Sequence, residues 1–469
     1  MFDYKTFIKI KLVCLCYLFC ASNIFANVND TTKFDEPIEY FVLSEDCPLK
    51  NNFEFVPRKN RLILIAKLIT YELTDQQKKR FDEIIFIEHF DVEHIVKAVK
   101  SRVNVIANAR LIANDDTIFQ IVTSVREQLG IPGPCLNELL PFCCKHTSKQ
   151  RLAGSNVDYP KFLLFNYECY IKNPTHYVNI VSNKLGFPII VKPTNLAASL
   201  ETKKINNLEE LSAWCCKHDP KKLLKYYGRA IPFIFETFIS TERFDLFHCD
   251  AIINNGQLIF TQVSRYGYPC MDVGANSKSL GSIFIPTTIR KYKALYELPE
   301  LVITAFKRFA PIPNGVMHLE AFRDRYNGQI VFLETQLRAP GGHICSAYKY
   351  ALGIDLVEVD YRLQMNLPIS LNKKEYFYTA WMHIPTQTGI IDRLILPKIR
   401  SNILKMDYKI VSHQKTESPS SLFSLLMHDH TALLIIIGSK KYADLVKDFN
   451  YLKEFKPCIY MDNTLNLKQ

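Results

Sequence analysis

Short apolar runs alternate with amphipathic segments in the first third of the chain. Residues 28–50 are polar and mixed, so we expect an irregular lead-in there. Beyond it, strand-like runs alternate with stretches whose apolar residues recur at helical spacing, which is typical of a parallel α/β layer. We therefore predict a first domain over residues 28–140. Its predicted strands are Leu62–Ala66, Glu83–Ile87 and Val103–Ala107, and its predicted helices are Val92–Val99 and Asp116–Leu129.

Two other regions mix helix and strand. Residues 141–230 contain a strand that ends at Lys192 and, further on, a helix that Asn207 can cap. Residues 369–469 contain short strands and then a helix close to the C-terminus. The clearest elements are the helix Asn207–Lys217, the strand Ala432–Ile437 and the helix Tyr442–Lys453.

Alternating apolar and polar positions dominate residues 231–368, which predicts antiparallel strands. The dipeptides Asn255-Gly256 and Asn327-Gly328 are hairpin signals between them. The predicted strands are Phe233–Ile239, His248–Ile253, Leu258–Val263, Val316–Phe322 and Ile330–Thr335.

The composition is that of a globular protein. A chain of 469 residues is long enough for about three domains. With 48% hydrophobic and 22% charged residues, disordered, collagenous and multi-span membrane proteins are excluded. The net charge is +11, but the lysines are scattered, so we expect a solvated surface and no nucleic-acid partner. The 14 cysteines contain no C-x-x-C spacing, which favours buried thiols in a reducing compartment.

The N-terminus resembles a secretory signal peptide. Basic residues at Lys5, Lys9 and Lys11 are followed by an uncharged apolar run. This run, Leu12–Ala21, is too short for a stable membrane span, which takes about 20 residues. We expect a signal-peptide-like leader over residues 1–27, with a buried first strand or helix as the alternative.

The densest chemical signal lies on two predicted strands around residue 330. Residues two apart on a strand share a face, so His318 and Glu320 point the same way. Glu334, Gln336 and Arg338 share a face on the next strand. Oxygen ligands suit Mg²⁺, and a neighbouring guanidinium can meet a developing oxyanion or phosphate. The alternative is an exposed hairpin face with ordinary charges.

The turn at Asn327-Gly328 decides whether the two glutamates can share a metal. Directly opposed residues on paired strands point to the same face. A two-residue turn would direct Glu334 to the far face, whereas a three-residue loop over Tyr326–Gly328 places Glu320 opposite Glu334. Such a loop requires a left-handed residue in third position. We therefore predict the three-residue loop, a positive φ at Gly328 and two adjacent carboxylates.

These strands resemble the metal-binding segment of the ATP-grasp superfamily of carboxylate–amine ligases. Glu320 and Glu334 match the two metal-binding glutamates, and Gln336 stands where the family usually has Asn. Arg338 matches the arginine that meets the acyl phosphate. It is followed by Gly341-Gly342, the only Gly-Gly pair of the chain, which would let a ligand approach the backbone.

The resemblance extends upstream to nucleotide contacts. Two lysines match those that contact ATP phosphates, and an apolar run around Glu236 matches the hinge that binds adenine through backbone groups. A glutamate inside such a run needs a partner if it is buried. The nucleotide contacts implied are Lys149, Lys192, Ser199, Glu236, Phe238 and Glu242, with Asp245 as the alternative to Glu242 for the ribose.

One segment departs from the family pattern. The loop after the second lysine, Thr194–Leu200, is normally glycine-rich and closes over the phosphates, but here it contains no Gly. Ala-Ala-Ser is small, and Ser199 can still donate a hydrogen bond. A stiffer lid would slow turnover or abolish it.

The resemblance covers residues 55–460 and implies an α/β architecture. A Rossmann-like preceding domain over residues 28–140 would be followed by two ATP-grasp subdomains and a small C-terminal α/β domain. The expected ranges of these last three are 141–230, 231–368 and 369–469.

The activity implied is ATP-dependent ligation with Mg²⁺ (or Mn²⁺) on Glu320, Glu334 and Gln336. ATP would phosphorylate a small-molecule carboxylate, an amine would attack the acyl phosphate, and ADP and phosphate would leave. Two alternatives are a biotin-carboxylase-like carboxylating subunit and a degenerate, non-catalytic ATP-binding module. A homodimer is compatible with the resemblance. ATP chemistry favours the cytoplasm, in tension with the signal-like leader.

Overall fold

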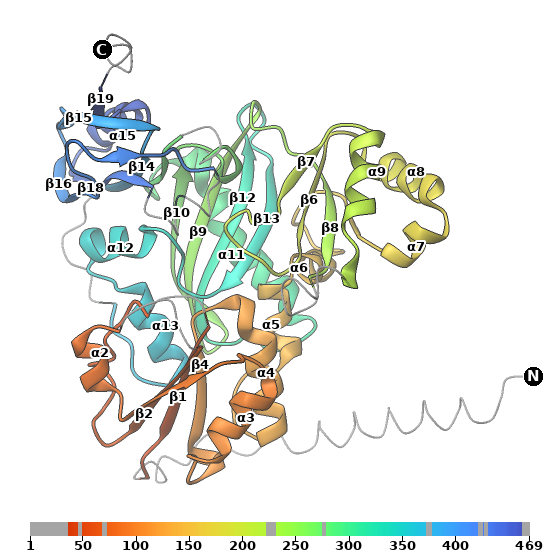
Figure 1. Cartoon of the computed structure of the whole chain (residues 1–469), viewed down its shortest axis with the longest axis vertical. Helices are drawn as coiled ribbons and strands as arrows, with labels where there is room; N and C mark the ends of the chain where they lie inside the picture. The colour runs from red at the N-terminus through yellow and green to blue at the C-terminus, as the bar shows by residue number, and fades with distance from the viewer. Residues whose placement is uncertain are drawn as a thin grey trace, which may run out of the picture.

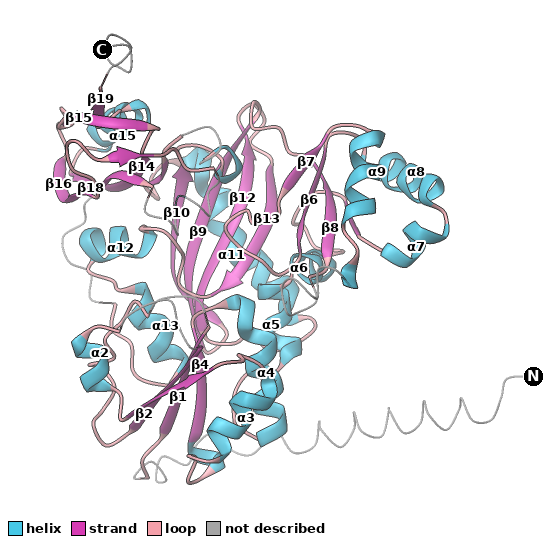
Figure 2. Cartoon of the chain, in the orientation of Figure 1, coloured by secondary structure: helices cyan, strands magenta, loops and turns pink. Residues whose placement is uncertain are grey.

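The computed structural model describes residues 36–45, 49–67, 73–221, 231–273, 278–371, 378–420, 425 and 430–461. The leader expected over residues 1–27 lies outside this set. Among the described residues, no helix combines the length and apolar character needed to cross a membrane. Strands and helices are interleaved along the described chain. The strands form several sheets, and helices pack against them (Figure 1, Figure 2).

The N-terminal sheet is parallel throughout, as the sequence predicts, with strand order β3-β2-β1-β4. Phe41 and Ile63 face the helices α3 and α4, whereas Tyr40 and Leu62 face the opposite side, toward α13. Apolar side chains therefore cover both faces, which is usual for a parallel sheet. The elements are β1 (Glu39–Ser44), β2 (Arg61–Lys67), α2 (Asp75–Arg80), β3 (Glu83–Ile87), α3 (Val92–Lys100), β4 (Ala109–Ala113) and α4 (Phe119–Leu129).

Two strand predictions in this sheet are wrong. Residues 28–50 are not irregular throughout, because β1 is a fully buried inner strand. The strand predicted at Val103–Ala107 lies instead at Ala109–Ala113, after a 3-10 turn at Ile106–Asn108. Pairing with β1 selects the segment that becomes β4, and a short apolar run does not reveal such a long-range pairing.

A smaller antiparallel sheet, with strand order β5-β8-β6-β7, carries three helices on one face (Figure 1). Asn207 caps the last of these helices through its side chain, as predicted. The strand predicted over Phe233–Ile239 belongs to this sheet and not to the antiparallel region after it. The elements are β5 (Phe162–Leu164), α7 (Tyr167–Lys172), α8 (Pro174–Leu185), β6 (Ile189–Pro193), β7 (Lys203–Ile205), α9 (Leu208–Lys217) and β8 (Phe233–Thr237).

The largest sheet is antiparallel, with strand order β13-β12-β9-β10-β11-β14-β18-β16. It runs without interruption across the expected domain boundary between residues 368 and 369. Its strands are β9 (Phe244–Asn254), β10 (Gln257–Tyr266), β11 (Leu280–Phe284), β12 (Gly315–Asp324), β13 (Ile330–Leu337), β14 (Tyr378–Pro385), β16 (Asn402–Tyr408) and β18 (Thr431–Ser439).

Helices cover both faces of this sheet. On one face, α5, α6 and α11 pack with the N-terminal sheet into one apolar cluster. On the other, α12 and α13 pack against β12 and β14. The remaining elements are α5 (Leu136–Cys143), α6 (Lys145–Leu152), α11 (Lys293–Lys307), α12 (Ile344–Leu352), α13 (Leu356–Gln364), β15 (Gly389–Leu394), β17 (Lys415–Thr416), α15 (Tyr442–Glu454) and β19 (Cys458–Tyr460).

The two Asn-Gly hairpins differ in loop length. Between β9 and β10, Asn255 and Gly256 form a two-residue turn in which both residues have positive φ. Between β12 and β13, the amide of Asp324 donates to the carbonyl of Gln329, so the loop holds four residues. The predicted three-residue loop is therefore wrong, whereas the positive φ at Gly328, +78°, is confirmed.

Candidate functional site

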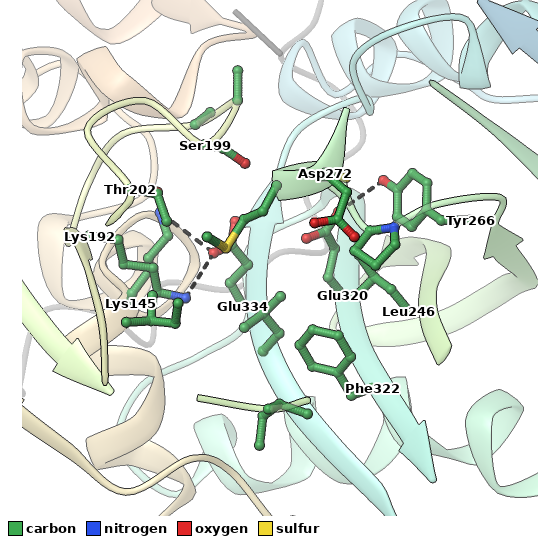
Figure 3. Close-up of a pocket in the computed structure, with 18 of the residues that line it drawn as sticks. Lys145, Lys192, Ser199, Thr202, Leu246, Tyr266, Asp272, Glu320, Phe322 and Glu334 are labelled. Atoms are coloured by element: carbon green, nitrogen blue, oxygen red, sulfur yellow. Dashed lines mark hydrogen bonds and ion pairs between the residues drawn. The ribbon is translucent and has the colours of Figure 1, made fainter. Parts of the chain in front are cut away.

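A cavity of about 390 Å³ opens between the small sheet and the β12–β13 edge of the large sheet (Figure 3). Residues of β6 and β8 form one wall, and residues of β12 and β13 form the opposite wall. Figure 3 shows Lys145 and Lys192 reaching toward Glu334 from one side, while Tyr266 reaches toward Glu320 on the other. Charged side chains from separate parts of the sequence therefore meet in one place.

A buried carboxylate joins the two predicted ATP lysines. Glu236, on β8, lies 2.9 Å from the Nζ of Lys149 and 3.1 Å from the Nζ of Lys192. All three side chains are almost inaccessible to solvent. Burial lowers the pKa of Lys149 to about 8, although Glu236 acts against this. The buried glutamate thus has the partners that its burial requires.

A third lysine completes the basic side of the cavity. Lys145 lies one turn before Lys149 on α6, with its Nζ 3.7 Å from the nearer oxygen of Glu334. Its Nζ also donates to the carbonyl oxygen of Leu196 in the lid loop. Sequence analysis missed Lys145, although the four-residue spacing from Lys149 places both on one helix face.

Glu334 lies among these lysines. Its side chain is 15% exposed, and Lys192 lies 3.5 Å from the same oxygen that faces Lys145. Burial raises the pKa of the carboxyl group, but the surrounding lysines outweigh burial and hold the pKa well below its ordinary value. Glu334 is therefore a carboxylate at neutral pH.

Glu320 faces the cavity from β12. The hydroxyl of Tyr266 donates to its Oε1 over 2.8 Å, and the Nε2 of His318 lies 3.6 Å from the same oxygen. Burial lowers the pKa of His318, but Asp250 and Glu320 outweigh it and raise the pKa to about 9.

The predicted pairing of Glu320 with Glu334 is confirmed, but the loop length and the bulge that produce it are not those that the sequence predicts. Glu320 lies directly opposite Glu334. The four-residue loop alone would place Leu333 opposite Glu320, but a β-bulge between Phe332 and Glu334 shifts the register by one residue. Leu333 consequently lines the cavity. A β-bulge is defined by two residues on one strand that lie opposite a single residue on the neighbouring strand.

The end of β13 supplies the remaining predicted groups. Gln336 donates through Nε2 to the Oε1 of Glu334 over 3.0 Å. Arg338 lines the cavity and donates to the carbonyl oxygen of Ala339. Gly342 has φ +60°, and a Cβ there would lie 3.1 Å from the ring of Trp381. A glycine is thus needed both for the backbone conformation and for the close approach of that ring.

The glycine-free lid takes conformations that glycine normally supplies. Ala198 and Ser199 have φ values of +55° and +54°, and both line the cavity. Left-handed backbone is costly for residues with a Cβ. The backbone of the lid is therefore strained at Ala198 and Ser199, two small residues in a conformation that glycine adopts more readily.

The nucleotide-base end differs from expectation in two respects. Phe238 lines the cavity, but its amide already donates to the carbonyl of Pro188 and so is not free to bind a base. Glu242 is exposed and does not line the cavity, and Asp245 forms an ion pair with Arg325. Neither acid is among the residues that line the cavity.

Several lining residues were not predicted. Asp272 brings a further carboxylate into the cavity from the 3-10 turn Cys270–Asp272, a segment with no charge pattern of its own (Figure 3). Tyr266 is the last residue of β10 and lies beyond the predicted strand Leu258–Val263. Arg265 and His343 are not among the lining residues, although Gly342 and Ile344 are.

Comparison with known proteins finds relatives among ligases. No family model matches the sequence. Over 234 residues the chain is 27% identical to the L-arginine-specific L-amino acid ligase of Bacillus subtilis, a match that covers 50% of this chain. The match covers 52% of that relative, so the chain spans about half the length of the curated relative it matches.

Solved structures share the fold over nearly the whole chain. An L-amino acid ligase from Bacillus licheniformis superposes with a TM-score of 0.65 at 14% identity, covering 91% of this chain and 100% of that one. The phosphoribosylglycinamide synthetase of Anaerococcus prevotii gives 0.57 at 12% identity, covering 90% and 100%. The biotin carboxylase domain of the Hydrogenobacter thermophilus 2-oxoglutarate carboxylase, solved as a dimer with MgADP and bicarbonate, gives 0.56 at 16%, covering 89% and 91%.

Proposed function

We propose that the chain is an ATP-grasp protein and acts as an ATP-dependent ligase that joins a carboxylate to an amine and releases ADP and phosphate, as its likeness to ligases supports. The observation that carries the proposal is the opposition of Glu320 and Glu334 across two strands, facing Lys145 and Lys192 in one cavity, with Lys149 fully buried beside them and outside the lining. Acidic and basic groups that converge in this way suit a metal–phosphate complex.

The donor set fits a divalent cation. Glu320 and Glu334 offer carboxylate oxygens, and Gln336 uses its NH₂ group on Glu334, which leaves the amide oxygen as its ligand-type atom. Mg²⁺ prefers such oxygen donors. When bound here, Mg²⁺ would neutralise charge on the β- and γ-phosphates.

The lysines and the arginine have separate roles in this proposal. Lys149 and Lys192 hold the phosphates, and Lys145 couples them to the lid through Leu196. Arg338 balances charge on the reacting carboxyl group. A carboxylate oxygen attacks the γ-phosphorus and ADP leaves. The amine nitrogen then attacks the acyl carbon, with loss of phosphate and a proton.

The test is an ADP-release screen over carboxylate and amine libraries, with and without Mg²⁺. We expect ADP only when Mg²⁺, a carboxylate and an amine are all present. ADP release that depends on bicarbonate and biotin would instead favour a carboxylating subunit. ATP binding without ADP formation would favour a non-catalytic module, an outcome for which the strained lid provides a physical basis.

A pair of variants tests the metal residues. Glu334→Gln removes a metal ligand, so ADP formation should fall by orders of magnitude. Asp245→Asn is the control, because Asp245 pairs with Arg325 outside the cavity, and it should retain turnover. Near-normal turnover of the Glu334 variant would remove the metal assignment.

Assembly and compartment remain predictions. The homodimer has one point of support, the dimer of the biotin carboxylase domain described above. Light scattering of the purified protein measures its mass directly. An ATP-containing compartment is expected from the chemistry, and a mature form beginning near Asn27 in an exported fraction would contradict it.

A further inference from the structure

A chain of buried polar side chains crosses an otherwise apolar layer beneath the cavity. His248 and Asp250 lie on β9 and are completely buried. Each is paired across the ladder with a residue of β12: His248 with Glu320, and Asp250 with His318. Their neighbours on the same face belong to an apolar cluster. Buried polar groups in such a layer need a full set of partners.

The donor inventory sets the direction of one half of this chain. The indole nitrogen of Trp381 can only donate, and it does so to the Oγ of Ser282 over 2.9 Å. The Oγ of Ser282 also lies 2.9 Å from the Nε2 of His248. The opposite ring nitrogen of His248 donates to the Oδ2 of Asp250 over 2.8 Å, because an ionised carboxylate only accepts.

The other half runs from Asp250 to the cavity. Asp250 accepts from the Nδ1 of His318 at 2.6 Å and from the hydroxyl of Tyr348 at 2.9 Å. The far nitrogen of His318 faces the same oxygen of Glu320 that accepts from Tyr266. Trp381 and Glu320, which both line the cavity, are thus the two ends of one network centred on Asp250.

The same cluster has the composition of a metal site, because ligand atoms of His248, Asp250 and His318 all lie within 4.8 Å of one another. Hydrogen bonding explains why these three side chains cluster better than a bound metal ion does. Each histidine already meets a separate oxygen of Asp250 at hydrogen-bond distance. Since both contacts are histidine–carboxylate, the three groups satisfy one another without an ion.

We propose that Asp250 is a positioning residue, which holds His318 against Glu320 and so fixes the orientation of the Glu320 carboxylate for metal binding. The proposal rests on the proposed function, because it takes Glu320 as a metal ligand. Partners that orient a ligand from outside the metal site typically change metal affinity by about 10- to 100-fold when they are removed.

The experiment measures Mn²⁺ binding to the full chain in the presence of ADP by electron paramagnetic resonance, without turnover. Asp250→Asn leaves one oxygen acceptor for three donors, so His318 loses its fixed orientation. We expect Mn²⁺ affinity to fall by about tenfold or more, while ADP affinity without metal stays within about twofold. Mn²⁺ affinity within twofold of the native protein would overturn the proposal.

Asp360→Asn is the matched control. Asp360 is also completely buried and also accepts three hydrogen bonds, from Val316, Asn114 and Gln364, but it does not line the cavity. It should lower thermal stability and leave Mn²⁺ affinity unchanged. An equal loss of Mn²⁺ affinity in this control would assign the effect to general destabilisation and overturn the proposal.

A second variant keeps the test decisive if Asp250→Asn does not fold. His318→Asn keeps a donor for Asp250 but removes the ring that reaches Glu320, and it should produce a similar loss of Mn²⁺ affinity. No loss would overturn the proposal. Failure of the native protein to bind Mn²⁺ with ADP would instead remove the metal assignment in the proposed function, and the positioning role with it.

Discussion

The Nζ of Lys149 donates a hydrogen bond to the carbonyl oxygen of Leu333 over 2.7 Å. Leu333 is the residue that bulges from β13, so the lysine holds the strand where its register shifts. The same ammonium group pairs with Glu236. One side chain on α6 therefore contacts both walls of the cavity and supports the turn of Glu334 into it.

This double role predicts a large stability effect for Lys149→Met. The change leaves Glu236 with one lysine and the Leu333 carbonyl without its partner. Removing one member of a buried ion pair costs about 3–5 kcal/mol, and we expect the free energy of unfolding to fall by that amount in denaturant titrations. Adding Glu236→Gln should recover part of the loss. A fall below about 1 kcal/mol would contradict the structural role.

Nucleotide affinity should decrease as the pH rises through about 8. Burial lowers the pKa of Lys149 to about 8, and phosphate binding favours the charged form. Calorimetric titration with ADP between pH 7 and 9.5 measures the effect. Lys149→Arg stays charged over this range, so its profile should be flat. Identical profiles for both proteins would assign the dependence to another group.

Lys149 should make the stability of the fold change with pH in the opposite direction to nucleotide affinity. Its pKa lies below the unfolded value of about 10.4. Between about pH 8 and that value, the unfolded chain binds more protons than the folded chain. The contribution of Lys149 to the free energy of unfolding should therefore increase with pH across this window, which denaturant titrations at several pH values can check.

Glycine in the lid should be stabilising where it relieves strain. Ala198 has φ +55°, and Ala198→Gly should raise the free energy of unfolding by up to about 1 kcal/mol. The adjacent residue Ala197 does not have a positive φ, so Ala197→Gly should lower it by about 0.5–1 kcal/mol through backbone entropy. Equal effects of the two changes would argue against a left-handed lid.

Measurements of ADP affinity can distinguish the roles of Glu242 and Asp272. Glu242→Gln should leave the dissociation constant of ADP within about twofold, because Glu242 does not line the cavity. Asp272→Asn alters a carboxylate inside the cavity and should change ligand affinity or metal requirement. A loss of ADP affinity of tenfold or more for the Glu242 variant would restore it as the ribose residue.

The large-scale architecture could be predicted because its signals are periodic. Alternating strands and helices predicted the parallel N-terminal sheet, and Asn255-Gly256 predicted a hairpin. A glutamate inside an apolar run predicted a partner if the carboxylate is buried, and Lys149 and Lys192 are its partners. The predictions that failed concerned strands whose pairing partners are distant in the sequence. The strand β8 joined the smaller sheet, and the C-terminal strands continued the large one.

By itself, the sequence determined which residue types can do the chemistry and on which face of a strand they stand, because the two-residue strand period is local. It placed Glu320 and Gln336 correctly. Only the tertiary structure decided how these residues meet. The bulge at Leu333 is accompanied by a contact from Lys149, 184 residues away, and Lys145, Tyr266 and Asp272 enter the cavity from other elements. Packing energy shared among distant segments sets such contacts, and no short stretch of sequence carries that information.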